Sequence, residues 1–385
     1  MKGHVRKRGK KSWAVVVDLG RDANGKRRQK WVSVKGNRRE AERKLTEVLR
    51  ELDTGTYVEP SKLTVREYLD LWLNDHAKGQ VGAKTFERYK QLIERHVVPT
   101  LGSYKLPELK PLHLQALYGK ALESGRSDGK GGLAPQTVVH IHRVLRTALK
   151  KAVKWQLLAR NPADAVDPPR ADKPEMKALD AEDTAKLLTA ASRSTLKGPI
   201  LVAVTTGVRR GELLALRWSD VELDRAELVI RRALQETNDG LSFKEPKTAR
   251  GRRLIALPGL TVQFMRQHKA DQAKQRLRLG PLYQDHGLIF PRPDGTPWPP
   301  DAFSTAFAAL IRRSDLPHIR FHDLRHSHAS QLLKQGVHPK VVSERLGHST
   351  IAITLDTYSH VLPGLQAIAA SEIDQLLNIA ISNQT

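Results

Sequence analysis

Six side chains in the second half of the chain have types that suit chemistry on a phosphodiester. They comprise two guanidinium groups, one ammonium group, two imidazoles and one phenol, on Arg209, Arg325, Lys247, His322, His348 and Tyr358. Guanidinium groups hold two oxygens of a phosphate at once, and imidazole groups transfer protons near neutral pH. A deprotonated phenol is a nucleophile that can attack phosphorus. The set is therefore compatible with cutting a phosphodiester through a covalent intermediate.

Each of these residues is ambiguous when it is taken alone. Arg209 and Glu212 lie three residues apart in a helix expected after Gly207, where such a pair is usually a structural ion pair. Lys247 lies near the tip of an expected hairpin, where a lysine is usually a solvated charge. Tyr358 stands beside apolar residues and is, by itself, more typical of a core than of a nucleophile.

The segment around residues 322–328 favours a paired site over a metal site. His322 and Arg325 are three residues apart, so on a helix they share one face. His326 and His328 complete a cluster of three histidines, which raises the alternative of a metal centre. The glutamate of a zinc-protease helix is absent and the chain has no cysteine, so we expect no metal here.

The charge of the chain favours a polyanionic partner. Lys and Arg number 65 against 41 Asp and Glu, which gives a net charge of +24 over 385 residues. Residues 1–50 hold 17 of these cations and 5 acids, so half of the net charge lies in an eighth of the chain. Nucleic acid is the commonest partner of so basic a protein. The alternative, a merely solvated cationic surface, is disfavoured by this uneven distribution.

Other features exclude several classes of protein. The absence of cysteine excludes disulfides and thiolate chemistry. No apolar run approaches the about 20 residues of a membrane span, and the charged start is not a secretory signal. We therefore expect a soluble protein in the cytoplasm of a bacterial cell, bound to DNA.

The order of the candidate residues narrows the alternatives further. The motifs of tyrosine recombinases, or phage integrases, come in the order that this chain shows: Arg209, Lys247, His322-x-x-Arg325, Leu-Gly-His348 and Tyr358. The strings TTGVRRGELLALRW, HDLRHSHAS, LGH and TLDTYSH match the family pattern between about residues 175 and 363. The chain strongly resembles this family, specifically integrases of three domains with an N-terminal arm-binding domain.

The resemblance implies a role for each residue. Arg209 and Arg325 would bind the non-bridging oxygens of the phosphate and stabilise the transition state. Tyr358 would attack phosphorus after His322 removes its proton, and Lys247 would protonate the departing DNA oxygen.

It also implies the supporting residues and partners. His348 would hydrogen-bond the phosphate, and Glu212 would orient the arginine and histidine side chains. Because the covalent bond stores the cleaved linkage, no nucleotide or metal cofactor is expected. The partners would be double-stranded DNA with core and arm-type sites, and three further copies in a tetramer that acts through a Holliday junction. Proteins that bend DNA or set directionality are further candidate partners.

The elements that must position these residues fall into a multidomain, mainly helical fold with small β elements. Residues 1–56 form a small domain of a hairpin and a helix, ββ(β)α in outline. Trp13 to Leu19 alternates like a strand, Asn24-Gly25 predicts a turn, and Asn37 can cap the helix. This domain would bind arm-type DNA, and the alternative is a basic hairpin of purely structural use.

The remaining regions are predominantly helical. Residues 62–162 read as an all-α core-binding domain, with helices near 85–96, 111–124 and 135–156. Residues 163–175, rich in proline, are the expected linker. Residues 176–363 form the catalytic domain, with a hairpin expected from 227–232 and 241–257. In the tail, 364–385, an apolar helix would dock on a neighbouring subunit or, as an alternative, on its own domain.

Thirteen basic residues are candidate DNA contacts. They are Arg6, Lys7, Arg8, Lys10, Lys11, Arg27, Arg28 and Lys30 in the first domain, and Lys84, Arg88, Arg143, Arg146 and Lys150 in the second.

Three other functions stay open at this point. A type IB topoisomerase uses similar chemistry but is disfavoured by the appended hairpin domain and the Leu-Gly-His motif. A Xer-type resolvase is disfavoured by the extra basic domain, and a catalytically dead DNA-binding regulator by the complete catalytic set. We expect an enzyme that integrates or excises a phage or another mobile element.

Overall fold

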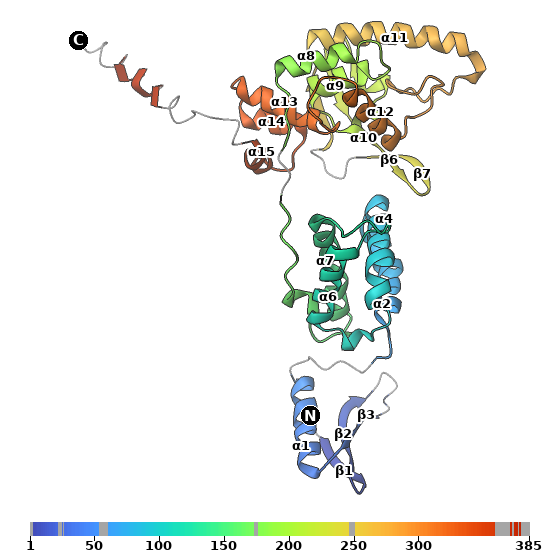
Figure 1. The fold of residues 1–385 in the computed structure, drawn as a ribbon, viewed down its shortest axis with the longest axis vertical. Helices are drawn as coiled ribbons and strands as arrows, with labels where there is room; N and C mark the ends of the chain where they lie inside the picture. Colours follow the sequence, from blue (N-terminus) through green and yellow to red (C-terminus); the bar gives the residue numbers. More distant parts are fainter. Residues whose placement is uncertain are drawn as a thin grey trace. The chain divides into compact units, whose positions relative to one another are not determined.

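The computed structural model describes residues 3–21, 25, 27–53, 61–172, 176–245 and 251–358, with residues 370–371, 373–375 and 377–378 of the tail. The chain divides into two compact units, Met1–Lys173 and Pro174–Thr385 (Figure 1). Both are mainly helical with small antiparallel sheets, which confirms the expected fold class. No helix formed by these residues is both long enough and apolar enough to cross a membrane.

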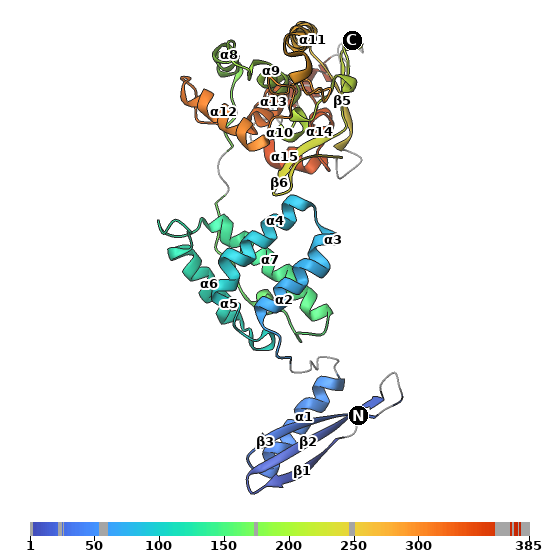
Figure 2. The same cartoon turned by 90° about the vertical axis from the view of Figure 1, so that its right-hand side faces the viewer.

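The first unit begins with a three-stranded antiparallel sheet covered on one face by a helix (Figure 2). Its elements are β1 (Gly3–Gly9), β2 (Ser12–Arg21), β3 (Arg27–Lys35) and α1 (Arg38–Asp53). Val15 and Val17 of β2 pack with Ala41 and Val48 of α1 in a small core. Asn37 caps α1 as predicted, because its side chain accepts a hydrogen bond of 3.0 Å from the Glu40 amide. Strand β1 adds to the predicted hairpin.

The helical part of this unit has a separate hydrophobic core. Its elements are α2 (Val65–Trp72), α3 (Lys78–Gln80), α4 (Ala83–Leu92), α5 (Val98–Leu101), α6 (Pro111–Ser124) and α7 (Pro135–Lys154). A π-helical turn at Leu73–Ala77 joins α2 to α3, and another at Ile93–Val97 joins α4 to α5. The buried ring of Trp72 stacks on Tyr89 at 5.8 Å between centroids. These helices present the basic candidates of α4 and α7 on their exposed faces.

The expected linker begins later than residue 163. Asn161 caps a 3-10 turn at Pro162–Ala165 by accepting a hydrogen bond from the Ala163 amide. Ala163 and Val166 are buried in the helical core, and Asp164 pairs with Arg146 of α7 at 2.7 Å. Proline is tolerated in the first turn of a helix, so the prolines here do not exclude local structure.

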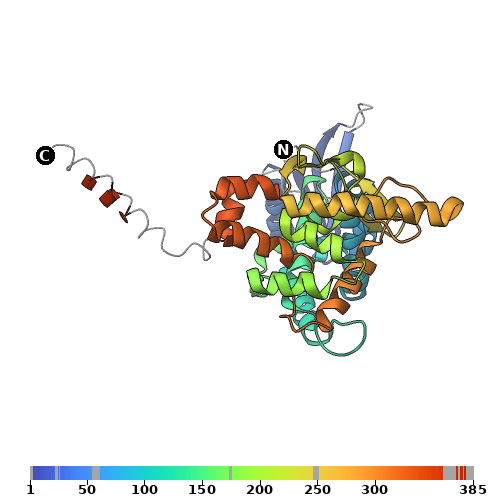
Figure 3. The ribbon, with the colours of Figure 1, turned by 90° about the horizontal axis from the view of Figure 1, so that it is seen from above.

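The second unit surrounds a buried helix, α9 (Lys197–Thr206), which packs against α11 and α13 (Figure 3). The other helices are α8 (Ala181–Ala190), α10 (Arg210–Leu214), α11 (Gly259–Leu279), α12 (Pro300–Arg312), α13 (Asp323–Lys334), α14 (Pro339–Leu346) and α15 (Ile351–Tyr358). Short 3-10 turns occur at Leu106–Glu108 in the first unit and at Trp218–Asp220 and Gly280–Leu282 in this one. Helix α9 is apolar nearly all round, which suits a central position.

The strands of this unit differ from the expected single hairpin. Strands β4 (Val221–Glu222), β5 (Glu227–Ile230) and β8 (Arg253–Ala256) form one antiparallel sheet, with Leu228 opposite Ile255. Between β5 and β8, strands β6 (Ala233–Thr237) and β7 (Gly240–Lys244) make a hairpin of their own. The two expected segments therefore do pair, through β5 and β8, but the start of the second segment forms β7 of a separate hairpin with β6.

Candidate active site

Five of the six predicted catalytic residues line one cavity of about 420 Å³. They are Arg209, His322, Arg325, His348 and Tyr358, and they are joined there by His326. The sixth, Lys247, lies outside the described residues. The five come from the start of α10, the first turn of α13, the connection between α14 and α15, and the end of α15. The fold therefore brings together side chains that are up to about 150 positions apart in the sequence.

Arg209 is held at the start of α10 by two hydrogen bonds that it donates to Glu212. The Arg209 amide donates to Oε2 of Glu212 at 2.9 Å, and Nη1 donates to Oε1 at 2.7 Å. A third hydrogen bond, 3.2 Å long, runs from Nη2 to the carbonyl of Gly347. The Arg209 side chain is still 41% exposed, so its guanidinium group is accessible from the cavity. Arg209 is therefore both a partner in a structural ion pair and a residue of the candidate site.

Arg253 is a member of this network that sequence reasoning missed. It is buried and donates to both carboxylate oxygens of Glu212, at 2.8 and 3.1 Å, and its Nε donates to the carbonyl of Arg345. Burial alone would raise the pKa of Glu212, but the hydrogen bonds and charges of Arg253 and Arg209 outweigh it and lower the pKa to about 2. Glu212 is thus a carboxylate at neutral pH, shared by two arginines.

Arg325 is a buried cation, and no carboxylate of the described residues contacts its guanidinium group. Its Nη1 donates to the carbonyl of Gly207 at 2.8 Å, and its Nη2 donates to the carbonyl of Leu346 at 2.7 Å. Burial, followed by the charge of Arg209, lowers the pKa of Arg325. A guanidinium group nevertheless stays protonated in proteins, so this unfavourable environment favours binding of an anion. The two arginines together give the cavity a positive charge that suits an anion.

The left-handed backbone of Gly207 allows the end of α9 to approach α13 and the end of α14 closely. Its φ is +67°, and a Cβ atom there would lie 2.6 Å from Leu346 and 2.7 Å from His328. Glycine is the residue that adopts this conformation without strain. The same position supplies the carbonyl that anchors Arg325, so the glycine sets the place of the guanidinium group.

The cavity histidines His322 and His348 are neutral near pH 7. Burial, together with the charges of neighbouring His326 and Arg325, lowers the pKa of His322 to about 4. Burial and the arginine charges lower the pKa of His348 to about 4 as well. Nδ1 of His348 is 2.8 Å from Oγ1 of Thr354, which fixes the ring. A neutral imidazole beside the cavity can donate one hydrogen bond and accept one proton.

Tyr358 combines a core position with a place in the site. The residue is only 1% exposed and packs with Ala329, Leu333 and Leu346. Its hydroxyl nevertheless borders the cavity and lies 2.7 Å from Nδ1 of His326. Burial raises the pKa of Tyr358 to about 12. Tyr358 is therefore a core residue by its ring, while its hydroxyl is available at the candidate site.

His328, the third histidine of the cluster, faces away from the cavity. Its Nδ1 lies 2.9 Å from the carbonyl of Val204, and its Nε2 accepts a hydrogen bond of 3.0 Å from Arg345. Both ring nitrogens are thus used in packing α13 against α9 and α14. Across the described part of the chain, no three His, Asp or Glu side chains are grouped closely enough to hold a metal ion.

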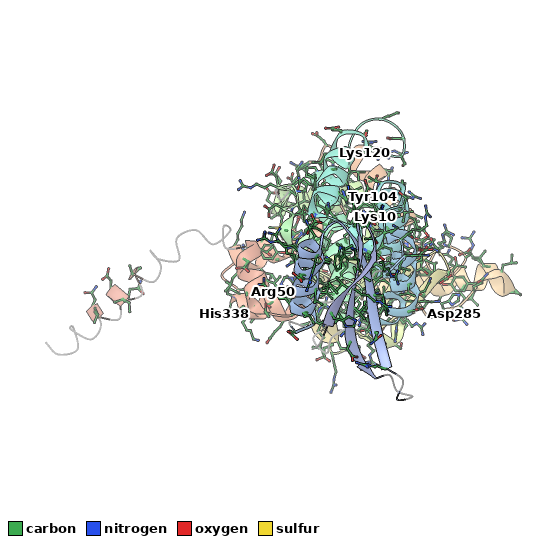
Figure 4. The ribbon with its side chains drawn as sticks, turned by 90° about the horizontal axis from the view of Figure 1, so that it is seen from below. Lys10, Arg50, Tyr104, Lys120, Asp285 and His338 are labelled. Carbon is green, nitrogen blue, oxygen red and sulfur yellow. The ribbon has the colours of Figure 1, made fainter. Side chains whose placement is uncertain are left out.

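The basic candidates in the first unit lie on its surface. Arg143, Arg146 and Lys150 follow one exposed stripe of α7, and Lys84 and Arg88 are exposed on α4. Arg6, Lys7, Arg8, Lys10, Lys11 and Arg27 are exposed in the first domain, and Lys10 is labelled in Figure 4. Lys30 is half-buried, and the side chain of Arg28 lies outside the described residues.

Two details of this surface were not predicted. Arg27 pairs with Asp18 at 2.6 Å, and Arg146 pairs with Asp164, so part of the positive charge is neutralised locally. Trp31 is 44% exposed, with the guanidinium group of Arg8 5.4 Å from its ring centre. An exposed aromatic ring beside arginines can pack against a nucleic acid.

Comparison with known proteins places these features in a family. Residues 177–364 match the model of the phage integrase family, and residues 64–122 match that of the phage integrase N-terminal SAM-like domain. An integrase of Streptomyces ambofaciens is 30% identical over 90% of this chain and 88% of its own length. A XerC-like tyrosine recombinase of Caldanaerobacter subterraneus is 28% identical over 96% of this chain and 97% of its own length.

Solved structures share the fold. The Tn1549 transposon integrase in complex with transposon right-end DNA aligns with a TM-score of 0.67 at 20% identity, over 82% of this chain and 100% of that one. A lambda integrase tetramer bound to a Holliday junction aligns with a TM-score of 0.56 at 20% identity, over 92% of this chain and 94% of the other.

Proposed function

We propose that this chain, which belongs to the phage integrase family of tyrosine recombinases, cuts and rejoins DNA through a covalent bond to Tyr358. It is a site-specific DNA recombinase, as its relatives are, and the assignment of its residues is our inference. The observation that carries this assignment is the convergence of Arg209, Arg325, His322, His348 and Tyr358 on one cavity.

The chemistry of the cavity fits a scissile phosphate. Arg209 and Arg325 would bind its non-bridging oxygens, because both guanidinium groups border the cavity. Among the described residues, Arg209 has a carboxylate partner in Glu212, whereas Arg325 is held by backbone carbonyls. Fixed cations that meet the charge developing in the transition state lower the barrier without having to reorganise. His348, held by Thr354, would donate a hydrogen bond to the same phosphate.

The covalent step needs two proton transfers. Tyr358 attacks phosphorus and loses its proton, and the DNA oxygen that leaves must gain one. We assign the second transfer to Lys247, as the family pattern implies. Rejoining reverses both transfers, so the cycle consumes no nucleotide. His322, at the start of α13, borders the cavity, where it would contact the phosphate or, as the family pattern implies, accept the proton of Tyr358.

The division of labour along the chain follows from its parts. We propose that residues 1–56 bind arm-type DNA, residues 62–162 bind the core site together with the catalytic domain, 176–363, and the tail, 364–385, contacts a neighbouring subunit. The exposed stripe of α7 and the open face of the first sheet would supply the phosphate contacts. By likeness to the lambda integrase tetramer on a Holliday junction, four copies would act together.

Three alternatives are less well supported. A Xer-type resolvase or a type IB topoisomerase would share the cavity, but the basic first domain favours an integrase that reads additional DNA sites. A regulator without activity would not need Tyr358 to border an anion site. These features support integration or excision of a mobile element as the overall reaction.

A covalent-capture experiment tests the proposal. The crossover site is first found by sequencing the DNA that stays attached to the chain after SDS treatment. The full chain is then incubated with nicked DNA that carries this site. We expect an adduct with the natural chain and none with Tyr358→Phe. Tyr283→Phe is the matched control, because Tyr283 lies in the same unit and its hydroxyl accepts from Gln272 away from the cavity. An adduct that persists in Tyr358→Phe would refute the proposal.

A further inference from the structure

One side chain that contacts the nucleophile has no part in the scheme above. Nδ1 of His326 lies 2.7 Å from the hydroxyl oxygen of Tyr358, a normal hydrogen-bond length, and both residues line the cavity. His322, the histidine that the family pattern singles out, is also described, yet no hydrogen bond connects it to Tyr358. The structure thus places a different imidazole against the reacting oxygen.

The position of His326 is well defined by its neighbours. His322 and His326 are four residues apart along α13, and their rings meet edge to face with 5.2 Å between centroids. The rings of His326 and Tyr358 are 5.8 Å apart at an angle of 53°. His326 therefore stands between His322 and the tyrosine, and helix α13 holds both rings in place.

The protonation states of the pair suit proton transfer from Tyr358. Burial lowers the pKa of His326, more than the nearby Asp323 raises it, so the ring is neutral near pH 7. With its proton on Nε2, the ring offers the lone pair of Nδ1 to the tyrosine. The pKa of Tyr358 is about 12, so very little phenolate forms unless a base accepts the proton during attack.

We propose that His326 is the catalytic base that accepts the phenolic proton of Tyr358. This inference rests on the proposed function and specifies one step of it. As the bond between the tyrosine oxygen and phosphorus forms, the proton moves to Nδ1 of His326, and the bond from phosphorus to the DNA oxygen breaks. That oxygen keeps the electron pair and takes a proton from Lys247.

Rejoining runs the same transfers backwards. The DNA hydroxyl attacks phosphorus and gives its proton to Lys247, while Tyr358 leaves and recovers its proton from His326. His322 packs against His326 and borders the phosphate cavity, so its own part is a hydrogen bond to the phosphate. His326 thus serves the nucleophile, and His322 serves the phosphate.

Two leaving groups distinguish a base from an acid. Formation of the covalent adduct is timed with full-length His326→Asn on a nicked crossover-site substrate with the natural oxygen leaving group, and on one with sulfur in its place. A thiolate leaves without protonation, so it restores a variant that lacks the acid but not one that lacks the base. We expect His326→Asn to be slower by about 10²-fold or more on both substrates, as for loss of a general base.

Control variants make the outcome specific. Lys247→Met should be slow with oxygen and restored with sulfur, and His318→Asn, an exposed histidine in the loop before α13, should match the natural chain on both. A His326→Asn rate within about threefold of the natural rate would overturn the inference, as would restoration by sulfur. An adduct in Tyr358→Phe would instead refute the proposed function, so the two failures are distinguishable.

A second variant covers a loss of folding. If circular dichroism or DNA affinity shows that His326→Asn does not fold, His326→Ala replaces it, because alanine favours the helix. Free imidazole should then restore adduct formation in His326→Ala and leave His318→Ala unchanged. A folded His326→Ala protein that binds DNA, is slow and gains nothing from imidazole would contradict the role of a base.

Discussion

Replacing Glu212 with glutamine should destabilise the catalytic part of the chain by about 3 kcal/mol at pH 7. The glutamine keeps the shape of the side chain but removes the charge that Arg253 and Arg209 share. The magnitude follows from the pKa of Glu212, which is about 2 in the fold against 4.5, the ordinary value for a glutamate. At about 1.4 kcal/mol per pKa unit, that difference corresponds to about 3 kcal/mol. Breaking a buried ion pair by removing one partner typically costs a similar amount.

The sign of the pH dependence follows from the direction of the shift. Because the fold lowers the pKa of Glu212, the stabilisation is complete above the unfolded value of 4.5 and is lost as the pH falls toward about 2. The natural chain and Glu212→Gln should therefore differ by about 3 kcal/mol at pH 7 but by only 1 to 2 kcal/mol, roughly, at pH 3. Below pH 2 the difference should vanish.

Hydrogen exchange measured peptide by peptide is the suitable assay, because the two units need not unfold together. At pH 7, peptides of α10 and β8 should exchange roughly 10²-fold faster in the variant. The control is Glu344→Gln, whose exposed pair with Lys340 contributes only about 0.5 kcal/mol. Equal protection in Glu212→Gln and the natural chain, or a difference that does not shrink in acid, would refute the account of the Glu212 network.

Three further predictions concern the phosphate and the DNA. Arg325→Lys cannot keep both hydrogen bonds to backbone carbonyls, so the rate of adduct formation should drop by about 10²-fold or more while equilibrium DNA binding changes little. A parallel weakening of DNA binding would argue against a role in the transition state. Lys150→Gln on the exposed stripe of α7 should lower the slope of log affinity against log salt by about 0.9 if it neutralises one phosphate, and an unchanged slope would remove it from the interface. Deleting residues 1–55 should abolish footprints on arm-type sites but spare adduct formation on the core site, and loss of both would contradict separate DNA-binding domains.

Periodic patterns of apolar residues predicted much of the fold. Helices α6 and α7 were placed within two residues of their ends because each has a stripe of buried side chains. Strand β1 was not located, because Val5 is its one apolar side chain and its neighbours are one histidine and three basic residues. An edge strand with an open face does not need the alternation that reveals a central strand. The π-helical turns at Leu73–Ala77 and Ile93–Val97 gave no signal either, since an extra residue per turn leaves only a local change of spacing.

The candidate site was predicted by residue type and order, and its supporting contacts were not. Arg253 and Leu254 show why. In β8 the side chains alternate, so Arg253 lies on the buried face with Ile255 while Leu254 is 55% exposed. Hydrophobicity alone would assign these two residues the opposite way. The distant Glu212 supplies the carboxylate that makes a buried arginine favourable, and no local pattern reveals a partner 41 positions away.

The three histidines at and after the N-cap of α13 pose the same problem. His322, His326 and His328 lie within seven residues, and their types and spacing permit a base, a phosphate ligand or a metal site. Their roles separate only in the fold, where His328 packs against α9 and His326 meets Tyr358. The arrangement of α13 and α15 therefore determines which imidazole reaches the nucleophile.

The most direct test of the proposed function is to identify the residue that is covalently bound to the DNA. The adduct trapped on nicked crossover-site DNA is digested with nuclease and protease, and tandem mass spectrometry locates the attached nucleotide. We predict a phosphodiester link to the phenolic oxygen of Tyr358. A nucleotide attached to any other side chain, or an adduct whose Tyr358 peptide is unmodified, would contradict the central claim.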